Sequence, residues 1–274
     1  RGLDLWAGVV IPSLFPFFVA AEIIKSTGFI RAAGVLLEPV MKPFFNVPGC
    51  GSFPLLMGIT SGYPVGAKIT CDFRENGDLT KSEAEKLLAY TNNSGPLFII
   101  GAVGSGMLGS NKAGIYLYIC HVLACLTVGF IFRFYKAERR ENDGKRNLNT
   151  FKTFKLRLFE NYRNTGNHFG IILSDAIKNS VSTILIIGGF IVLFSVIIAF
   201  LKESNLFSSL SMILSRILSV FKIDRSTIEG VLCGLFEITT GSEIISDSPG
   251  ISAIIKLPAI SFIIGWAGLS VHFQ

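Results

Sequence analysis

Long apolar segments separated by short polar ones make up most of the chain. Five segments of about 20 largely apolar residues have the length at which a helix crosses roughly 30 Å of hydrocarbon. They cover residues 5–24, 87–108, 113–135, 181–201 and 251–274. Two amphipathic pieces, residues 35–45 and 208–221, precede two further apolar segments that are interrupted. The pattern predicts an all-helical polytopic membrane protein.

These two segments, residues 50–71 and 230–245, are each interrupted halfway by a polar, glycine-containing turn. The first turn runs from Ser61 to Pro64, where the proline disfavours helix at the preceding residue and removes a backbone donor. The second turn runs from Glu237 to Gly241. Non-helical backbone at membrane depth is tolerated only where protein or a watery cavity surrounds it. We therefore expect two re-entrant hairpins, each made of two half-helices that return to the same side.

Elements recur in the same order in the two halves of the chain. Each half has a helix, an amphipathic piece, an interrupted hairpin and a helix with a polar break. An offset of 176 residues (234 minus 58) lays Gly58 over Gly234 and Ser94 over Ser270. Few residues are identical at this offset, so the order of elements carries the prediction of an internal repeat.

Two helix starts match the capping box, in which a hydroxyl residue and an acidic residue three positions later cap the helix together. Thr80 with Glu83 is predicted to open the helix after the first hairpin. Ser226 with Glu229 is predicted to open the second hairpin.

The distribution of charged residues predicts how the two halves are oriented in the membrane. The net charge is +6, from 25 basic and 19 acidic residues. Ten basic and four acidic residues lie between Arg133 and Arg163, so this segment alone carries +6 (ten minus four). A basic loop beside a hydrophobic helix stays in the cytoplasm, and a nucleic-acid surface is disfavoured because the loop has no fold to present one. The first hairpin then enters from the cytoplasm and the second from the opposite side. Such inverted halves are typical of secondary transporters.

Composition argues against several other classes. Half of the residues are hydrophobic and 16% are charged, whereas soluble domains are about 25% charged. The five cysteines form no CxxC pair, the three histidines lie far apart, and no P-loop or catalytic triad occurs. We therefore predict no enzyme, no metal site and no cofactor. The chain starts at Arg1 and stops inside an apolar segment, so we expect it to be a piece of a longer protein.

Candidate binding residues of the first half lie at the first hairpin and in the polar break that follows it. They are Ser61, Gly62, Tyr63, Lys68, Asn92, Asn93, Ser94 and Gly95. Hydrogen-bonding side chains inside an apolar helix are costly unless they face partners or water. One interpretation is contact with a substrate or ion, and the other is hydrogen bonding between helices.

Candidate residues of the second half lie in the second turn and near the end of the chain. They are Glu237, Thr239, Thr240, Ser242, Ser270 and His272. A carboxylate at membrane depth is functional by default, so Glu237 is a candidate proton carrier. The alternative is a shallow hairpin that leaves Glu237 in water. His272 is either a functional side chain or one held by an ordinary hydrogen bond.

Four strings occur in an order that resembles one family: LWAGVVIPSLFPFF, GITSGYPVGAK, EAEKLLAYTNNSGPLFIIGAVG and GLSVHFQ. They resemble the YlbJ family, sporulation integral membrane proteins of endospore-forming bacteria that carry the nucleoside-recognition Gate domain. The resemblance covers the whole chain. It implies a fold similar to concentrative nucleoside transporters and to the membrane part of FeoB iron transporters. It also implies transport of dipicolinic acid from the mother cell across the outer forespore membrane.

Residues and resemblance together predict four regions. They are a first Gate-like repeat at 1–110, a linking transmembrane helix at 111–135, a basic cytoplasmic loop at 136–167 and a second, inverted and truncated Gate-like repeat at 168–274.

The expected function is transport of a small organic anion, dipicolinate, with a proton or sodium as the coupling ion. Helix N-termini near the membrane midplane would bind the anion, with Lys68 as its charge partner. The first alternative substrate is a nucleoside, with Glu237 and Asn93 holding the ribose hydroxyls. The second alternative is a non-transporting membrane scaffold for spore assembly.

Overall fold

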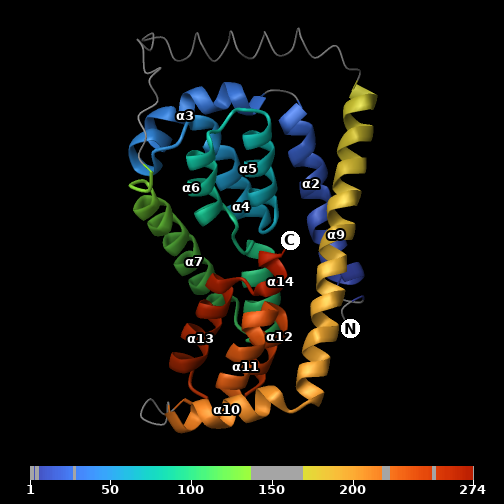
Figure 1. Cartoon of the computed structure of the whole chain (residues 1–274), viewed down its shortest axis with the longest axis vertical. Helices are drawn as coiled ribbons and strands as arrows, with labels where there is room; N and C mark the ends of the chain where they lie inside the picture. The colour runs from blue at the N-terminus through green and yellow to red at the C-terminus, as the bar shows by residue number, and fades with distance from the viewer. Residues whose placement is uncertain are drawn as a thin grey trace. The chain divides into compact units, whose positions relative to one another are not determined.

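The computed structural model describes residues 3, 6–26, 29–136, 169–217, 223–248 and 251–273 (Figure 1). Within these residues every regular element is a helix, as the apolar pattern predicts. The predicted basic loop lies outside the described residues except for Lys136.

The elements up to residue 107 include two short π-helical segments and one 3-10 turn. In chain order they are η1 (Trp6–Val10), α2 (Ile11–Ser26), α3 (Phe29–Phe45), η2 (Gly49–Gly51), α4 (Ser52–Ser61), α5 (Val65–Glu75), α6 (Lys81–Thr91) and η3 (Leu97–Met107). The remaining elements are α7 (Asn111–Phe132), α9 (Phe169–Glu203), α10 (Leu206–Ile217), α11 (Arg225–Phe236), α12 (Ile238–Asp247), α13 (Ala253–Trp266) and α14 (Leu269–His272).

Three segments of the described chain are long and apolar enough to cross a membrane: Asn111–Phe132, Phe169–Glu203 and Ala253–His272. The longest of them, α9, exposes large apolar side chains such as Val196 and Phe200, which suits a lipid-facing surface.

The predicted span 87–108 is wrong as a continuous helix. It divides into the end of α6, a non-helical stretch at 92–95 and η3. Pro96 cannot donate to the helical ladder, and the residue before it is biased away from helix. In residues 5–24, by contrast, η1 leads directly into the 16-residue α2 without a break. Residues 251–274 contain a break at Ala267 and Gly268, between α13 and α14.

Contacts divide the chain into two compact units. The first-pair unit comprises residues 14–93 and 124–182, and it contains α4 and α5, the first helix pair. The second-pair unit comprises residues 1–13, 94–123 and 183–274, and it contains α11 and α12, the second helix pair. The division falls between Asn93 and Ser94, inside the predicted polar break.

The first helix pair packs closely because glycines let backbone meet backbone. Helices α4 and α5 pack on each other and on α6 (Figure 1). The turn between them needs Gly62, whose φ of 86° disfavours any side chain. A Cβ added to Gly58 or Gly66 would lie 1.9 or 2.0 Å from the carbonyl oxygen of Thr91. The end of α6 therefore sits directly against both helices of the pair.

The second helix pair is built in a similar way. Helices α11 and α12 pack on each other and on α13. A Cβ on Gly241 would lie 2.4 Å from the Cα of Gly234. Gly268, in the break between α13 and α14, has a φ of 80°, and its Cβ would lie 3.4 Å from the Cα of Glu237. In each unit, an interrupted helix follows the helix pair. The interruption packs against that pair.

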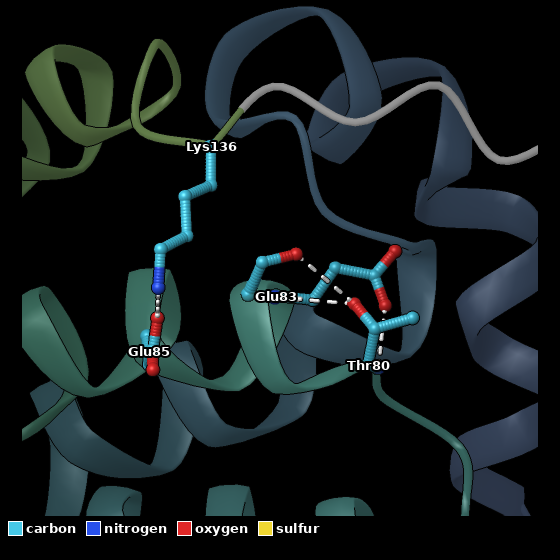
Figure 2. A network of polar contacts seen from close by, with 5 residues as sticks. Thr80, Glu83, Glu85 and Lys136 are labelled. Atoms are coloured by element: carbon cyan, nitrogen blue, oxygen red, sulfur yellow. Dashed lines mark hydrogen bonds and ion pairs between the residues drawn. The ribbon is translucent and has the colours of Figure 1, made fainter.

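The first predicted capping box is confirmed (Figure 2). The backbone N–H of Glu83 donates to Thr80 Oγ1 at 3.3 Å, and the backbone N–H of Thr80 donates to Glu83 Oε2 at 2.8 Å. Figure 2 also shows an ion pair in the same unit, with Lys136 Nζ 3.0 Å from Glu85 Oε2. This contact lowers the pKa of the Glu85 carboxyl.

The second predicted capping box is wrong. Helix α11 begins at Arg225 and is capped by Asp224, whose carboxylate accepts the backbone N–H of Ser226 at 2.9 Å. Aspartate is as strong an N-cap as serine. The helix is therefore capped by Asp224, which precedes Ser226 in the chain.

We predict that Gly58→Ala and Gly66→Ala destabilise the first-pair unit by about 1–3 kcal/mol or more, as overpacking against an immobile backbone does. Thermal unfolding in detergent would measure the loss. Gly170→Ala is the matched control, because nothing lies within 4 Å of its added Cβ. Equal melting temperatures for all three variants and the wild type would contradict this packing.

Candidate functional site

The first-pair unit contains two candidate side chains that each have a buried polar atom without a hydrogen-bond partner among the described residues. Ser61 ends α4, and Asn92 follows the last residue of α6. Neither Ser61 Oγ nor Asn92 Oδ1 has a partner among the described residues. Leaving a buried polar atom unsatisfied costs about 1–3 kcal/mol. These two atoms are therefore positions where a solute or water would be stabilised.

The N-terminus of α5 lies next to Ser61 in the chain, across the Gly62–Pro64 turn. Helix α5 starts at Val65, and no side chain caps it. The first N–H groups of a helix lack intrahelical acceptors and carry a partial positive charge. The Val65 N–H donates to the carbonyl oxygen of Gly62 at 3.2 Å, so the turn joins a helix start without a side-chain cap to a buried serine hydroxyl.

Asn93 has a different role. Its Nδ2 donates to the carbonyl oxygen of Tyr90 at 2.8 Å and to the sulfur of Cys125 at 3.2 Å. The thiol of Cys125 in turn donates to the same Tyr90 carbonyl at 2.8 Å. This buried network ties the end of α6 to α7, so the contacts of Asn93 match the helix-to-helix interpretation.

Lys68 is paired within the protein. Its Nζ lies 3.1 Å from Glu22 Oε1, and Asn179 Nδ2 donates to Glu22 Oε2 at 3.3 Å. Sequence reasoning missed both partners. A usable signal existed for Glu22, which is the one acidic residue within the apolar segment 5–24.

The second-pair unit contains Ser94, the last polar residue of the break. Its backbone N–H donates to His121 Nε2 at 3.1 Å, so the neutral His121 ring carries its proton on Nδ1. Ser94 Oγ is buried with no partner among the described residues, and Gly95 follows it. Sequence reasoning also missed His121, although it is a polar residue within the apolar segment predicted as helix 113–135.

Glu237 caps α12 with both carboxylate oxygens. Oε1 accepts the backbone N–H of Thr239 at 2.8 Å, and Oε2 accepts that of Thr240 at 2.7 Å. Only 8% of Glu237 is exposed. The α12 N-terminus was expected to be available to an anion, but the protein's own carboxylate occupies these two N–H groups. Thr239 and Thr240 therefore take part through their backbone.

Other candidates of the second half divide between the second helix pair and the end of the chain. Ser242 Oγ is buried without a partner among the described residues, as are the hydroxyls of Thr227 and Ser246 from the same pair. Ser270 is buried in α14. His272 Nδ1 bonds the carbonyl oxygen of Gly268 at 2.7 Å, which matches the ordinary hydrogen-bond interpretation.

This arrangement can bind a small polar solute. Each unit encloses neutral hydroxyl or amide groups at helix breaks, while the charged candidates Lys68 and Glu237 are engaged by protein groups. Together with the spanning helices, it defines an integral membrane protein that encloses polar groups in an apolar helical frame.

Comparison with known proteins gives the family. The model of the family described as "Gate: Nucleoside recognition" matches residues 7–135. The sporulation integral membrane protein YlbJ of Bacillus subtilis (strain 168) is 40% identical over 276 aligned positions, covering 100% of this chain and 67% of the relative. The chain belongs to the YlbJ family of sporulation integral membrane proteins, so the predicted family and membrane location are confirmed. No solved structure matches the chain.

The Glu237 carboxylate caps α12, and it is also the predicted proton carrier. Substitutions can separate these two roles. We predict that Glu237→Ala destabilises the second helix pair by about 1 kcal/mol, as loss of an N-cap does, whereas Glu237→Asn, a neutral capping residue, restores most of this stability. Chemical unfolding of both variants in detergent would measure the difference. Equal stability of the alanine variant and the wild type would show that the cap is unimportant.

Proposed function

We propose that the chain forms the core of a transporter that carries a small organic anion, dipicolinate, across the outer forespore membrane. The observation that carries the proposal is a set of buried polar atoms without hydrogen-bond partners among the described residues: Ser61 Oγ, Asn92 Oδ1 and Ser94 Oγ at helix breaks, and Ser242 Oγ within α12. Polar groups in a membrane protein that lack protein partners mark a place for water or solute. Membership of a sporulation membrane protein family supports the biological setting.

The chemistry of the first-pair unit suits a carboxylate ligand. A serine hydroxyl donates one hydrogen bond, and Ser61 supplies such a donor beside the uncapped start of α5. A helix N-terminus favours negative charge through its free N–H groups and its dipole. The pyridine dicarboxylate would place one carboxylate at this start.

The proposal includes re-entrant hairpins and an inverted relation between the halves. The recurring order of elements supports it, as does the packing of each helix break against its helix pair. Inverted repeats with interrupted helices put binding groups near the membrane midplane. The positive charge of residues 136–167 would hold that loop in the cytoplasm.

Proton coupling is proposed to pass through Glu237. A dianion about 5 Å from an ionised carboxylate meets repulsion of roughly 7 kcal/mol at an effective dielectric constant of 20. Glu237 would therefore have to bind a proton if it came this close to the substrate. Glu237→Asn keeps a cap without the charge, so it separates this role from helix capping.

A nucleoside is the second candidate substrate, because the Gate match is described as nucleoside recognition and covers residues 7–135. The groups expected to hold the ribose are engaged, since Asn93 bonds Tyr90 and Cys125, and Glu237 caps α12. A non-transporting scaffold for spore assembly is the remaining alternative, and it would not need the unpartnered hydroxyls.

Flux of labelled dipicolinate and of labelled uridine into vesicles that contain the full-length protein tests the proposal. We predict uptake of dipicolinate above that of uridine, and at least a tenfold loss of this uptake in Ser61→Ala and Ser242→Ala. Stability should stay within about 1 kcal/mol of the wild type, because neither hydroxyl has a hydrogen-bond partner to lose among the residues that the structure describes.

Ser180→Ala is the matched control, since Ser180 Oγ donates to the carbonyl oxygen of Ala176 inside α9. It should transport normally. Uptake of uridine alone would favour the nucleoside alternative, and uptake of neither solute would favour the scaffold.

A further inference from the structure

Three helices of the first-pair unit bring one buried acid, one base and one amide together. Glu22 comes from α2, Lys68 from α5 and Asn179 from α9. Lys68 Nζ lies 3.1 Å from Glu22 Oε1, and Asn179 Nδ2 lies 3.3 Å from Glu22 Oε2. The Phe18 ring centroid is 5.7 Å from the same ammonium nitrogen.

The two side chains of the ion pair differ in their exposure to solvent. The Glu22 side chain is 9% exposed, whereas that of Lys68 is 25% exposed. A pair taken out of water gains little net stability, because desolvation of both charges offsets their attraction. Charged groups enclosed by apolar helices instead mark functional sites. Here solvent reaches the cation more readily than its partner.

Lys68 also lies close to the proposed anion position. It is in the first turn of α5, and its backbone N–H donates to the carbonyl oxygen of Pro64 at 2.9 Å. A carboxylate at the uncapped start of α5 would therefore be about one helical turn from the residue that carries the ammonium group.

We propose that Glu22 is an internal competitor that holds Lys68 in the absence of substrate and gives it up to a carboxylate of the bound anion. The proposal rests on anion transport as the function. Asn179 keeps hold of the displaced Glu22 through Oε2, and the ring of Phe18 stabilises the ammonium during the exchange by a cation–π contact. The competitor would select solutes that bring a carboxylate of their own, because a neutral solute cannot replace Glu22 on Lys68.

Equilibrium binding of labelled dipicolinate to the full-length protein tests this inference. We expect Glu22→Gln to bind dipicolinate at least about fivefold more tightly than the wild type, which corresponds to loss of a competing ion pair of about 1 kcal/mol. Adding Lys68→Gln to Glu22→Gln should then weaken binding at least about tenfold. If Glu22→Gln fails to fold, Glu22→Asp serves instead, because its shorter side chain weakens the contact and should tighten binding to a smaller extent.

The chain supplies its own matched control. Glu85→Gln removes another Glu–Lys pair of this unit, at 3.0 Å from Lys136 and with both side chains more exposed, and it should leave binding within twofold. Equal dissociation constants for the wild type and Glu22→Gln, with dipicolinate bound by both, would overturn the role of Glu22 and leave the transport proposal standing. No dipicolinate binding by the wild type or any variant would overturn both.

Discussion

The packing of both helix pairs depends on close contact between backbones at glycine residues. Gly58 and Gly66 bring two helices directly onto the carbonyl oxygen of Thr91, and Gly241 meets Gly234 in the second helix pair. A membrane interior offers no water to satisfy an interrupted helix, so protein must enclose the interruption. Side chains larger than hydrogen at these positions would push the helices apart and expose the broken backbone to lipid.

The close contacts also divide the polar residues into two groups. The side chains of Asn93, Lys68 and Glu237 have partners in the protein, and these contacts hold helix ends, join helices and cap α12. The hydroxyls of Ser61 and Ser94 are buried without a partner among the described residues. Within one continuous polar break, Asn93 therefore stabilises the fold while its neighbour Ser94 keeps an available hydroxyl.

Much of this architecture could be predicted from the sequence because its signals are local. Glycine, proline and a run of polar residues within an apolar segment predict a helix break, and a break occurs in both segments. The second break was predicted too long, because only Glu237 of the expected turn 237–241 is non-helical and α12 starts at Ile238. The capping box at Thr80 is equally local. The start of α11 was misplaced because two neighbouring capping residues competed for it, and the local pattern does not rank them.

The partners of the candidate residues could not be predicted, because they come from distant parts of the chain. Glu22 reaches Lys68 from a helix more than 40 residues away, and His121 accepts the Ser94 N–H from α7. Tertiary packing decides these pairings, and a single sequence contains no periodic signal for them. The same limit explains why the α12 N-terminus was expected to be open although Glu237 occupies it.

The central claim is that the unpartnered buried hydroxyls face a solute. Labelling of Ser61→Cys by a small hydrophilic thiol reagent, in a full-length protein without other cysteines, tests it most directly. The account predicts that the reagent modifies this cysteine and that dipicolinate slows the modification, whereas Ser180→Cys, buried within α9, stays unmodified. A Ser61→Cys variant that reacts no faster than Ser180→Cys, or that dipicolinate does not protect, would contradict the account.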